Sequence, residues 1–121
     1  METNGYYKRI VSSLLGQTPD LKELGQRVDW GGSGAVLQMY YETSGKDRDN
    51  FISAIGRVIE EEESPPVVAQ VLHIASSLNL TQVEPSVHVL ESKSVASVPL
   101  VHEAIFNFLA YENLFSRGRG R

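Results

Sequence analysis

Hydrophobic residues along this chain recur every three or four positions, which is the spacing of one face of an α-helix. The first stripe runs from Tyr6 to Leu15 and stops before Gly16, a residue type that often ends a helix. Alternation with a period of two is confined to the short stretches 87–91 and 95–98, so we predict an all-α fold. The predicted helices cover about residues 4–15, 19–27, 35–44, 49–61, 66–78, 81–91 and 99–113.

Local signals mark several helix ends. The glycine-rich residues 30–34 predict a loop, in which Ser33 caps the next helix, and Gly45 is expected to close that helix. Asn79 is expected to serve as the C-cap of the helix before it. Thr81-Gln82-Val83-Glu84 has the form of a capping box, in which the hydroxyl and the carboxylate each accept a hydrogen bond from a free backbone amide.

One pattern occurs twice. SPPVV at residues 64–68 opens one predicted helix, and SVPLV at residues 97–101 opens another 33 residues later. The apolar positions of these two helices coincide at the same offset, and an offset of about 32 places Phe51 over Val83 in the other two helices. The chain is therefore predicted to form helix pairs, 35–44 with 49–61 and 66–78 with 81–91, followed by an unpaired helix, 99–113.

Stacked helix hairpins of this length form α-solenoids, in which one pair buries its apolar face only against the next. Over about residues 34–113 the chain resembles the HEAT and armadillo-like helical repeat proteins, with Pro66 and Pro99 near the start of the first helix of each unit. The resemblance implies a short stack of antiparallel helix hairpins. The chain lacks the family's regular aspartate in the turns and its regular arginine opening each second helix, so an irregular helical bundle remains the alternative.

The length of 121 residues fits one helical domain, which we place at residues 1–115, followed by a flexible arginine- and glycine-rich tail at residues 116–121. The chain has no cysteine, which excludes disulfides and thiolate chemistry. The N-terminal residues lack the pattern of a secretory signal, and no apolar run approaches about twenty residues. We therefore expect a cytoplasmic protein without a membrane span.

Charge is unevenly distributed along the chain. The formal net charge is −4, but Arg117, Arg119 and Arg121 lie in the tail, and the remainder holds 8 basic and 15 acidic residues. An acidic body repels nucleic acid and attracts a basic protein. Three arginines at a terminus are also few for binding nucleic acid. We expect a basic protein partner and no nucleic acid, and the oligomeric state stays open.

No set of residues has the spacing of a catalytic or metal site. His102 and Glu103 could open a zinc-protease helix motif, but its second histidine would fall at residue 106, which is Phe106. His73, His88 and His102 lie on separate predicted helices, so no two of them have ligand spacing. We predict no catalytic residue, no metal site and no cofactor, which leaves an enzyme without support.

The run from Glu60 to Glu63 stands at the predicted end of a helix, where the helix dipole is negative and further negative charge is unfavourable. Two interpretations are open. The helix continues through the run, and the unfavourable charge then indicates a function. Alternatively, the helix ends near Ile59 and the acidic side chains are solvated in a loop.

The leading hypothesis is a small non-catalytic module that binds another protein through an acidic helical surface with aromatic anchors. One concrete form is an immunity or antitoxin-like inhibitor that covers a basic partner. The alternative is a small helical enzyme or ligand-binding bundle with a pocket lined by His73, His102 and aromatic residues. The residues predicted to bind the partner are Tyr40, Tyr41, Asp47, Asp49, Glu60, Glu61, Glu62 and Glu63.

Overall fold

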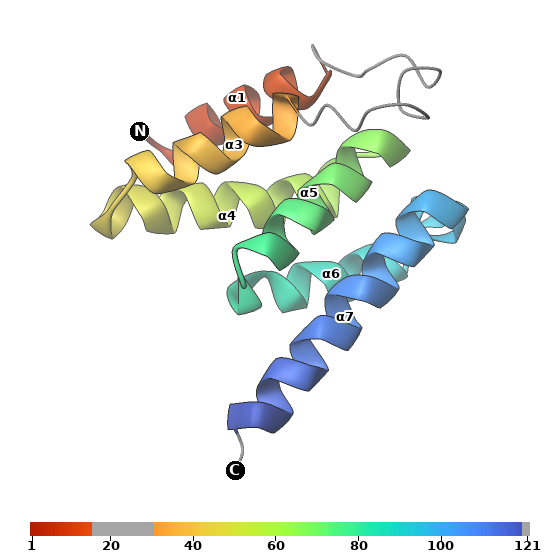
Figure 1. The fold of residues 1–121 in the computed structure, drawn as a ribbon. Coiled ribbons are helices and arrows are strands. Elements are labelled where there is room, and N and C mark those ends of the chain that lie inside the picture. The colour runs from red at the N-terminus through yellow and green to blue at the C-terminus, as the bar shows by residue number, and fades with distance from the viewer. Residues whose placement is uncertain (16–30, 120–121) are drawn as a thin grey trace.

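The computed structural model describes residues 1–15 and 31–119, the side chains of 31–33 and 111–119 excepted. All regular structure in this part of the chain is helical, which confirms the all-α prediction. The helix predicted over 19–27 lies outside the described residues. The elements are α1 (Thr3–Leu15), α3 (Gly31–Glu42), α4 (Gly45–Glu61), α5 (Pro65–Ser77), the 3₁₀ helix η1 (Thr81–Val83), α6 (Glu84–Glu91), the 3₁₀ helix η2 (Ser94–Ser97) and α7 (Pro99–Arg119) (Figure 1).

The helices form two layers. Figure 1 shows α3, α5 and α7 in front and α1, α4 and α6 behind them. Packing is most extensive between α5 and α7, between α1 and α4, and between α4 and α6. The two layers meet where α1 contacts α3 and where α4 contacts α5. Helices α5 and α6, which the sequence predicts as a pair, contact each other less than α5 contacts α7, because α6 lies in the other layer beside α4.

Phe51 of α4 lies at the centre of the core and has no solvent-exposed surface. The centroid of its ring is 5.7 Å from that of Tyr6 and 6.0 Å from that of Tyr40. The first pair meets edge to face and the second is tilted, which are favourable geometries for aromatic rings. The three rings join α1, α3 and α4, and aliphatic side chains from the remaining helices extend the same core.

Helix α3 begins earlier than the sequence predicts. The loop predicted at residues 30–34 is wrong for Gly31 to Gly34, which form the first turn of α3, so the backbone of Ser33 lies inside the helix and not at its N-cap position. A glycine in a helix costs about 1 kcal/mol relative to alanine. Val36 and Met39 are buried in the core, and tertiary packing of this kind overrides weak local propensity.

The turn between α3 and α4 requires glycine. Thr43 is buried there, and its hydroxyl donates a hydrogen bond to the carbonyl of Tyr40 at 2.7 Å. Gly45 has a φ of 55°, a left-handed conformation that residues with a side chain rarely adopt. The prediction that Gly45 closes the helix before it is wrong, because α3 ends at Glu42 and Gly45 is the first residue of α4, four residues before the predicted start.

Helix α5 ends in a Schellman motif. Asn79 adopts a φ of 55°, and its amide donates to the carbonyl of Ser76 at 3.2 Å. The amide of Leu80 donates to the carbonyl of Ala75 at 2.9 Å, and the Leu80 side chain is buried. These two bonds satisfy carbonyls at the end of the helix. The helix end predicted at Asn79 is confirmed.

The predicted capping box after this motif is wrong. Thr81 belongs to η1, and α6 begins at Glu84 with no side-chain cap on its first turn. Leu80 and Val83 are both buried, so this short segment is held against the core in a 3₁₀ turn. Pro85 lies in the first turn of α6, where its missing amide costs no hydrogen bond.

Replacing Phe51 with alanine is expected to lower the free energy of unfolding by about 3–5 kcal/mol, because the change leaves a cavity between three helices. Urea unfolding followed by far-UV circular dichroism measures this value. Phe106→Ala is the matched control, since the Phe106 side chain is 66% exposed, and it should change the free energy by less than about 0.5 kcal/mol. Equal effects of the two substitutions would contradict the central position of Phe51.

Candidate partner-binding surface

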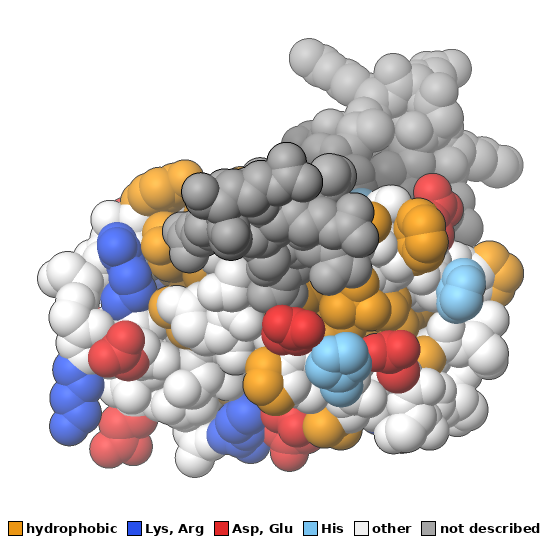
Figure 2. All heavy atoms as spheres, turned by 90° about the horizontal axis from the view of Figure 1, so that it is seen from below, with side chains coloured by type: hydrophobic (Ala, Val, Ile, Leu, Met, Phe, Trp, Pro, Cys, Tyr) orange, Lys and Arg blue, Asp and Glu red, His pale blue; other side chains and the backbone are white. Residues whose placement is uncertain are grey.

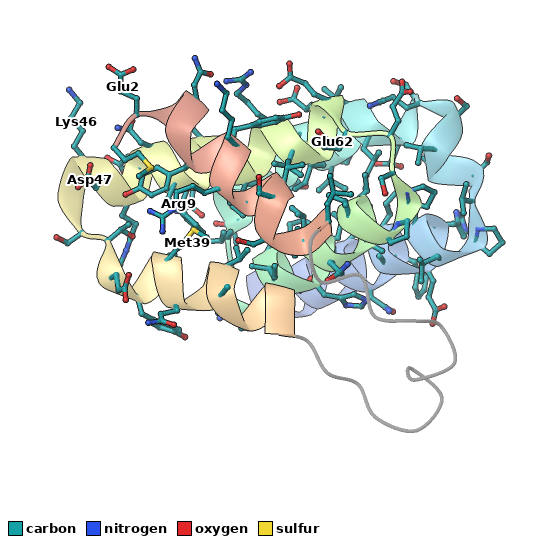
Figure 3. The ribbon with its side chains drawn as sticks, turned by 90° about the horizontal axis from the view of Figure 1, so that it is seen from above. Glu2, Arg9, Met39, Lys46, Asp47 and Glu62 are labelled. Carbon is teal, nitrogen blue, oxygen red and sulfur yellow. The ribbon has the colours of Figure 1, made fainter. Side chains whose placement is uncertain are left out.

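The residues predicted to bind a partner fall into two groups at opposite ends of α4. Tyr40, Tyr41, Asp47 and Asp49 lie near its start, and the run Glu60 to Glu63 lies at its end. A helix of 17 residues is about 25 Å long. Figure 3 shows this separation, with Asp47 at one end of α4 and Glu62 at the other. The structure does not bring the two groups together into one site.

The two tyrosines of the first group have different environments. Tyr40 is partly buried, and its ring contacts Phe51 and the ring of Tyr41. Tyr41 is 71% exposed. Successive residues on a helix point about 100° apart, so one ring faces the core and the next faces solvent. Tyr41 is the side chain of this pair that is available to a partner.

Arg48 fixes the turn beside these tyrosines. Its Nη2 atom donates to the carbonyls of Tyr40 at 3.1 Å and Thr43 at 2.6 Å, and its guanidinium lies 4.3 Å from the centre of the Tyr40 ring. A cation at the end of a helix compensates the negative end of the helix dipole. The positive charge of Arg48 is therefore directed to the end of α3. Asp49, the next residue, is exposed.

Lys93 performs the same task at the end of α4. Its Nζ atom donates to the carbonyl of Glu60 at 2.7 Å and lies 3.4 Å from the carbonyl of Glu62. The helix runs to Glu61, with Glu62 as its C-cap, so it extends into the acidic run but does not pass through it. The ammonium group offsets the accumulation of negative charge at this helix end.

Three of the four glutamates in the run bond within the molecule. Glu60 accepts from the Ser86 hydroxyl of α6 at 3.0 Å, Glu61 pairs with Arg57 at 2.9 Å, and Glu62 accepts from the hydroxyl of Tyr7 at 2.7 Å. The side chain of Glu63 is exposed and has no bonding partner among the described residues. A role in partner binding stays a prediction for all four residues, and Glu63 is the one whose carboxylate is free for it within the described structure.

The hydrogen bond to Glu62 changes the acidity of Tyr7. Burial of the phenol, its bond to Glu62 and the negative charges of Glu62 and Glu61 raise the pKa of Tyr7 to about 12, and Arg57 acts in the opposite direction. The Tyr7 ring also lies 5.0 Å from the guanidinium carbon of Arg57. Tyr7 therefore stays protonated well above the pH at which a free tyrosine ionises.

The three histidines lie on three helices and all are exposed. His73 is on α5, His88 on α6 and His102 on α7. No group of three histidine or acidic side chains in the described structure is arranged to hold a metal ion. His88 lies between Glu91, 2.7 Å from Nδ1, and Glu84, 3.4 Å from Nε2. Its bonds to Glu91 and then to Glu84 raise its pKa.

No role is predicted for His88 from the sequence, although Glu84 four residues before it and Glu91 three residues after it have the spacing that forms such a cluster on a helix. The cluster adds two carboxylates of α6 to the acidic groups at the end of α4. The Ser86–Glu60 hydrogen bond shows that these two helices are adjacent here.

The grooves on the described surface include two larger ones and a smaller one of about 270 Å³ beside Glu63 and Lys93. The first, of about 470 Å³, runs between α1 and α3, and Arg9 and Met39 line it (Figure 3). The second, of about 400 Å³, lies between α7 and the segment from the end of α6 to η2. His102 and Phe106 line this second groove, whereas His73 does not.

Figure 2 views the molecule from the side of α6 and α7 and shows histidine and acidic side chains next to exposed hydrophobic ones. In the described part of the chain, no helix combines the length and the apolar character needed to cross a membrane. No known protein family matches the chain, and neither a curated protein nor a solved structure matches it.

Replacing Lys93 with methionine is expected to lower the free energy of unfolding by about 1 kcal/mol, because the carbonyls that end α4 lose a cation. Thermal and urea unfolding measure the change. The control is Lys46→Met, which removes the same charge from the first turn of the same helix, where a cation is unfavourable, and it should not destabilise the protein. If Lys46→Met lowers the free energy of unfolding by as much as Lys93→Met, the effect comes from the change in net charge and not from the helix end.

The Tyr7–Glu62 pair predicts a specific alkaline dependence. Because the pKa of Tyr7 is about 12 in the folded protein and 10.0 as its ordinary value, unfolding releases a proton between these pH values, and stability falls as pH rises from 10 to 12. Tyr7→Phe should show a shallower decline over this range when unfolding is measured at successive pH values. Tyr41→Phe changes an exposed ring, and the stability of this variant should fall with pH as steeply as that of the wild type.

Proposed function

We propose that this protein is a non-catalytic helical module that binds a basic protein partner through the acidic surface of α4 and α6. The observation that carries the proposal is the charge balance of this region. Between Gly45 and Glu91 there are eight acidic and three basic residues. Arg48 bonds to the end of α3, and Arg57 pairs with Glu61. Two of the three basic residues are therefore engaged within the molecule, and acidic residues remain in excess in this region.

The excess charge is carried by exposed or half-exposed side chains on neighbouring elements. Asp49 lies on α4, Glu63 follows α4, and Glu84 and Glu91 lie on α6. Like charges on one surface attract an oppositely charged partner and speed its association, and they repel nucleic acid. We call these four residues the acidic surface, which is extended along the length of α4, with Asp49 near the start of that helix and Glu63 beyond its end. Tyr41, which is exposed near the start of α4, adds an aromatic side chain of the type that anchors interfaces.

As a further part of the proposal, the helices form a short α-solenoid of the HEAT and armadillo-like kind. The pairs that pack most closely within each layer include α5 with α7 and α4 with α6. These are the helices that the sequence offsets of 33 and about 32 relate to each other. Such stacks offer long open surfaces rather than enclosed pockets, which suits the binding of a protein.

An immunity or antitoxin-like inhibitor is the concrete form of this function that we propose. A small acidic domain would act by covering the basic surface of a harmful partner, and it would need no catalytic group. The support for this form is the acidic charge together with grooves that are open to solvent.

The test begins with affinity capture from the native source and then measures the binding of the purified partner by calorimetry. The variant is Asp49→Asn combined with Glu63→Gln, which removes two charges without breaking a hydrogen bond in the described structure. We expect a basic partner, roughly five- to tenfold weaker binding to the variant, and a dissociation constant that rises with salt. This pair is preferable to changing Glu60 to Glu63 together, because three of those side chains bond internally.

Lys46→Gln is the control, since it changes one charge near the same surface in the opposite direction, and it should leave binding unchanged or strengthen it. A neutral or acidic partner, or a dissociation constant that depends neither on salt nor on the double substitution, would overturn the proposed function.

A further inference from the structure

Helix α7 carries two adjacent apolar stripes. Val101, Ala104 and Phe108 are buried where α7 packs on α5. A second stripe follows His102 at intervals of three, four and seven residues and lines the open groove of about 400 Å³, although Ile105 in it is only 6% exposed and also belongs to the core. Phe106 in this stripe is 66% exposed. This spacing is the one through which a helix receives another helix. The lining residues of the stripe are His102, Ile105, Phe106 and Leu109.

The opposite wall of the groove is formed by the end of α6 and by η2, through Glu91, Ala96 and Ser97. The stripe on α7 spans about two helical turns, or roughly 10 Å. We call this groove the α6–α7 groove.

The position of the α6–α7 groove in the two layers indicates what fits it. Helix α5 packs between α3 and α7, and α4 packs between α1 and α6. Within the described part of the chain, α6 and α7 each have a neighbour on only one side in their layer. The groove lies between these two outermost helices, where a further helix would continue the packing.

The charges around the groove select the kind of helix. Glu91 lies in its wall, Glu84 lies on the same helix, and Glu103 is exposed on α7. Lys93 is the basic residue that lines the groove, but its ammonium group is 2.7 Å from the carbonyl of Glu60 and serves the end of α4. His88, when protonated, adds one positive charge against the two carboxylates beside it. The rim of the groove therefore favours a basic ligand.

We propose that the α6–α7 groove binds an amphipathic helix of a basic partner protein, with its apolar side chains against Phe106 and its lysines or arginines near Glu91 and Glu103. The proposal rests on the proposed function and adds the place and the form of binding. A second copy of this chain fits less well. Symmetric pairing through the groove would bring Glu91 and Glu103 of both copies into one interface, where like charges repel.

The test uses a labelled synthetic helix as the probe. This peptide of about 16 residues has leucine at helical intervals of three and four and lysine at most other positions. Two further peptides serve as controls: one has glutamate in place of lysine, and the other is a scrambled sequence of the same composition. Fluorescence anisotropy gives the dissociation constant of each with the full chain. The lysine peptide is expected to bind at least about tenfold more tightly than either control.

Substitutions then locate the binding. Phe106→Ala should weaken the lysine peptide about tenfold or more, and Glu91→Gln with Glu103→Gln should weaken it about threefold to tenfold and reduce its salt dependence. Leu15→Ala is the matched control, because Leu15 is an exposed apolar residue (49%) on α1, which does not line the groove. It should leave the dissociation constant unchanged. Circular dichroism of each variant verifies that the fold is retained.

Several results would overturn the groove proposal. These are equal binding of the scrambled peptide, equal effects of Phe106→Ala and Leu15→Ala, or concentration-dependent self-association in sedimentation that Phe106→Ala abolishes. The natural partner separates this proposal from the proposed function. If the natural partner binds more weakly as salt rises but its affinity is unchanged by Phe106→Ala, the groove proposal is refuted and the proposed function stands. Binding that is insensitive to salt would refute the function, whatever Phe106 does.

Discussion

The charge arrangement of this molecule depends on one constraint, the acidic end of α4, and hydrogen bonds from Lys93 compensate it. Helix α4 packs against α1, α5 and α6, so it joins both layers. It also ends in four consecutive glutamates, which oppose its own dipole. The ammonium group of Lys93 relieves this conflict and ties the connection between α6 and α7 to the connection between α4 and α5. The bond therefore fixes one helix end and the relative position of two connections.

The hydrophobic pattern was sufficient to predict the described helices, because burial of an apolar stripe is a periodic and local signal. Boundaries were less predictable where packing opposes propensity. Gly31 to Gly34 form helix because Val36 and Met39 are buried a turn later, and Thr81 enters a 3₁₀ turn because Leu80 and Val83 face the core. These outcomes depend on contacts with distant helices, which a local sequence window does not contain.

The candidate site was less predictable than the fold, for a related reason. Tyr40 and Tyr41 are neighbours in the sequence, yet the first contacts Phe51 and the second faces solvent. The glutamates at the end of α4 looked equivalent in the sequence. The structure distinguishes them through bonds to residues 26 and 55 positions away, Ser86 and Tyr7. Which acids remain free for a partner is a property of the packed molecule.

The way the molecule uses its cations also accounts for the character of its surface. Arg48 and Lys93 direct their charge to the carbonyl ends of α3 and α4, and Arg57 pairs with Glu61. The bonds of Arg48 and Lys93 stabilise helix ends and at the same time direct two positive charges away from the exterior, whereas the exposed Arg57–Glu61 pair is neutral overall. The carboxylates on α6 and α7 have no comparable partners in the described structure apart from His88. Stabilisation of the helix ends and an acidic exterior therefore have a common cause, and a basic helix placed beside Phe106 would supply the positive charge that the fold has used internally.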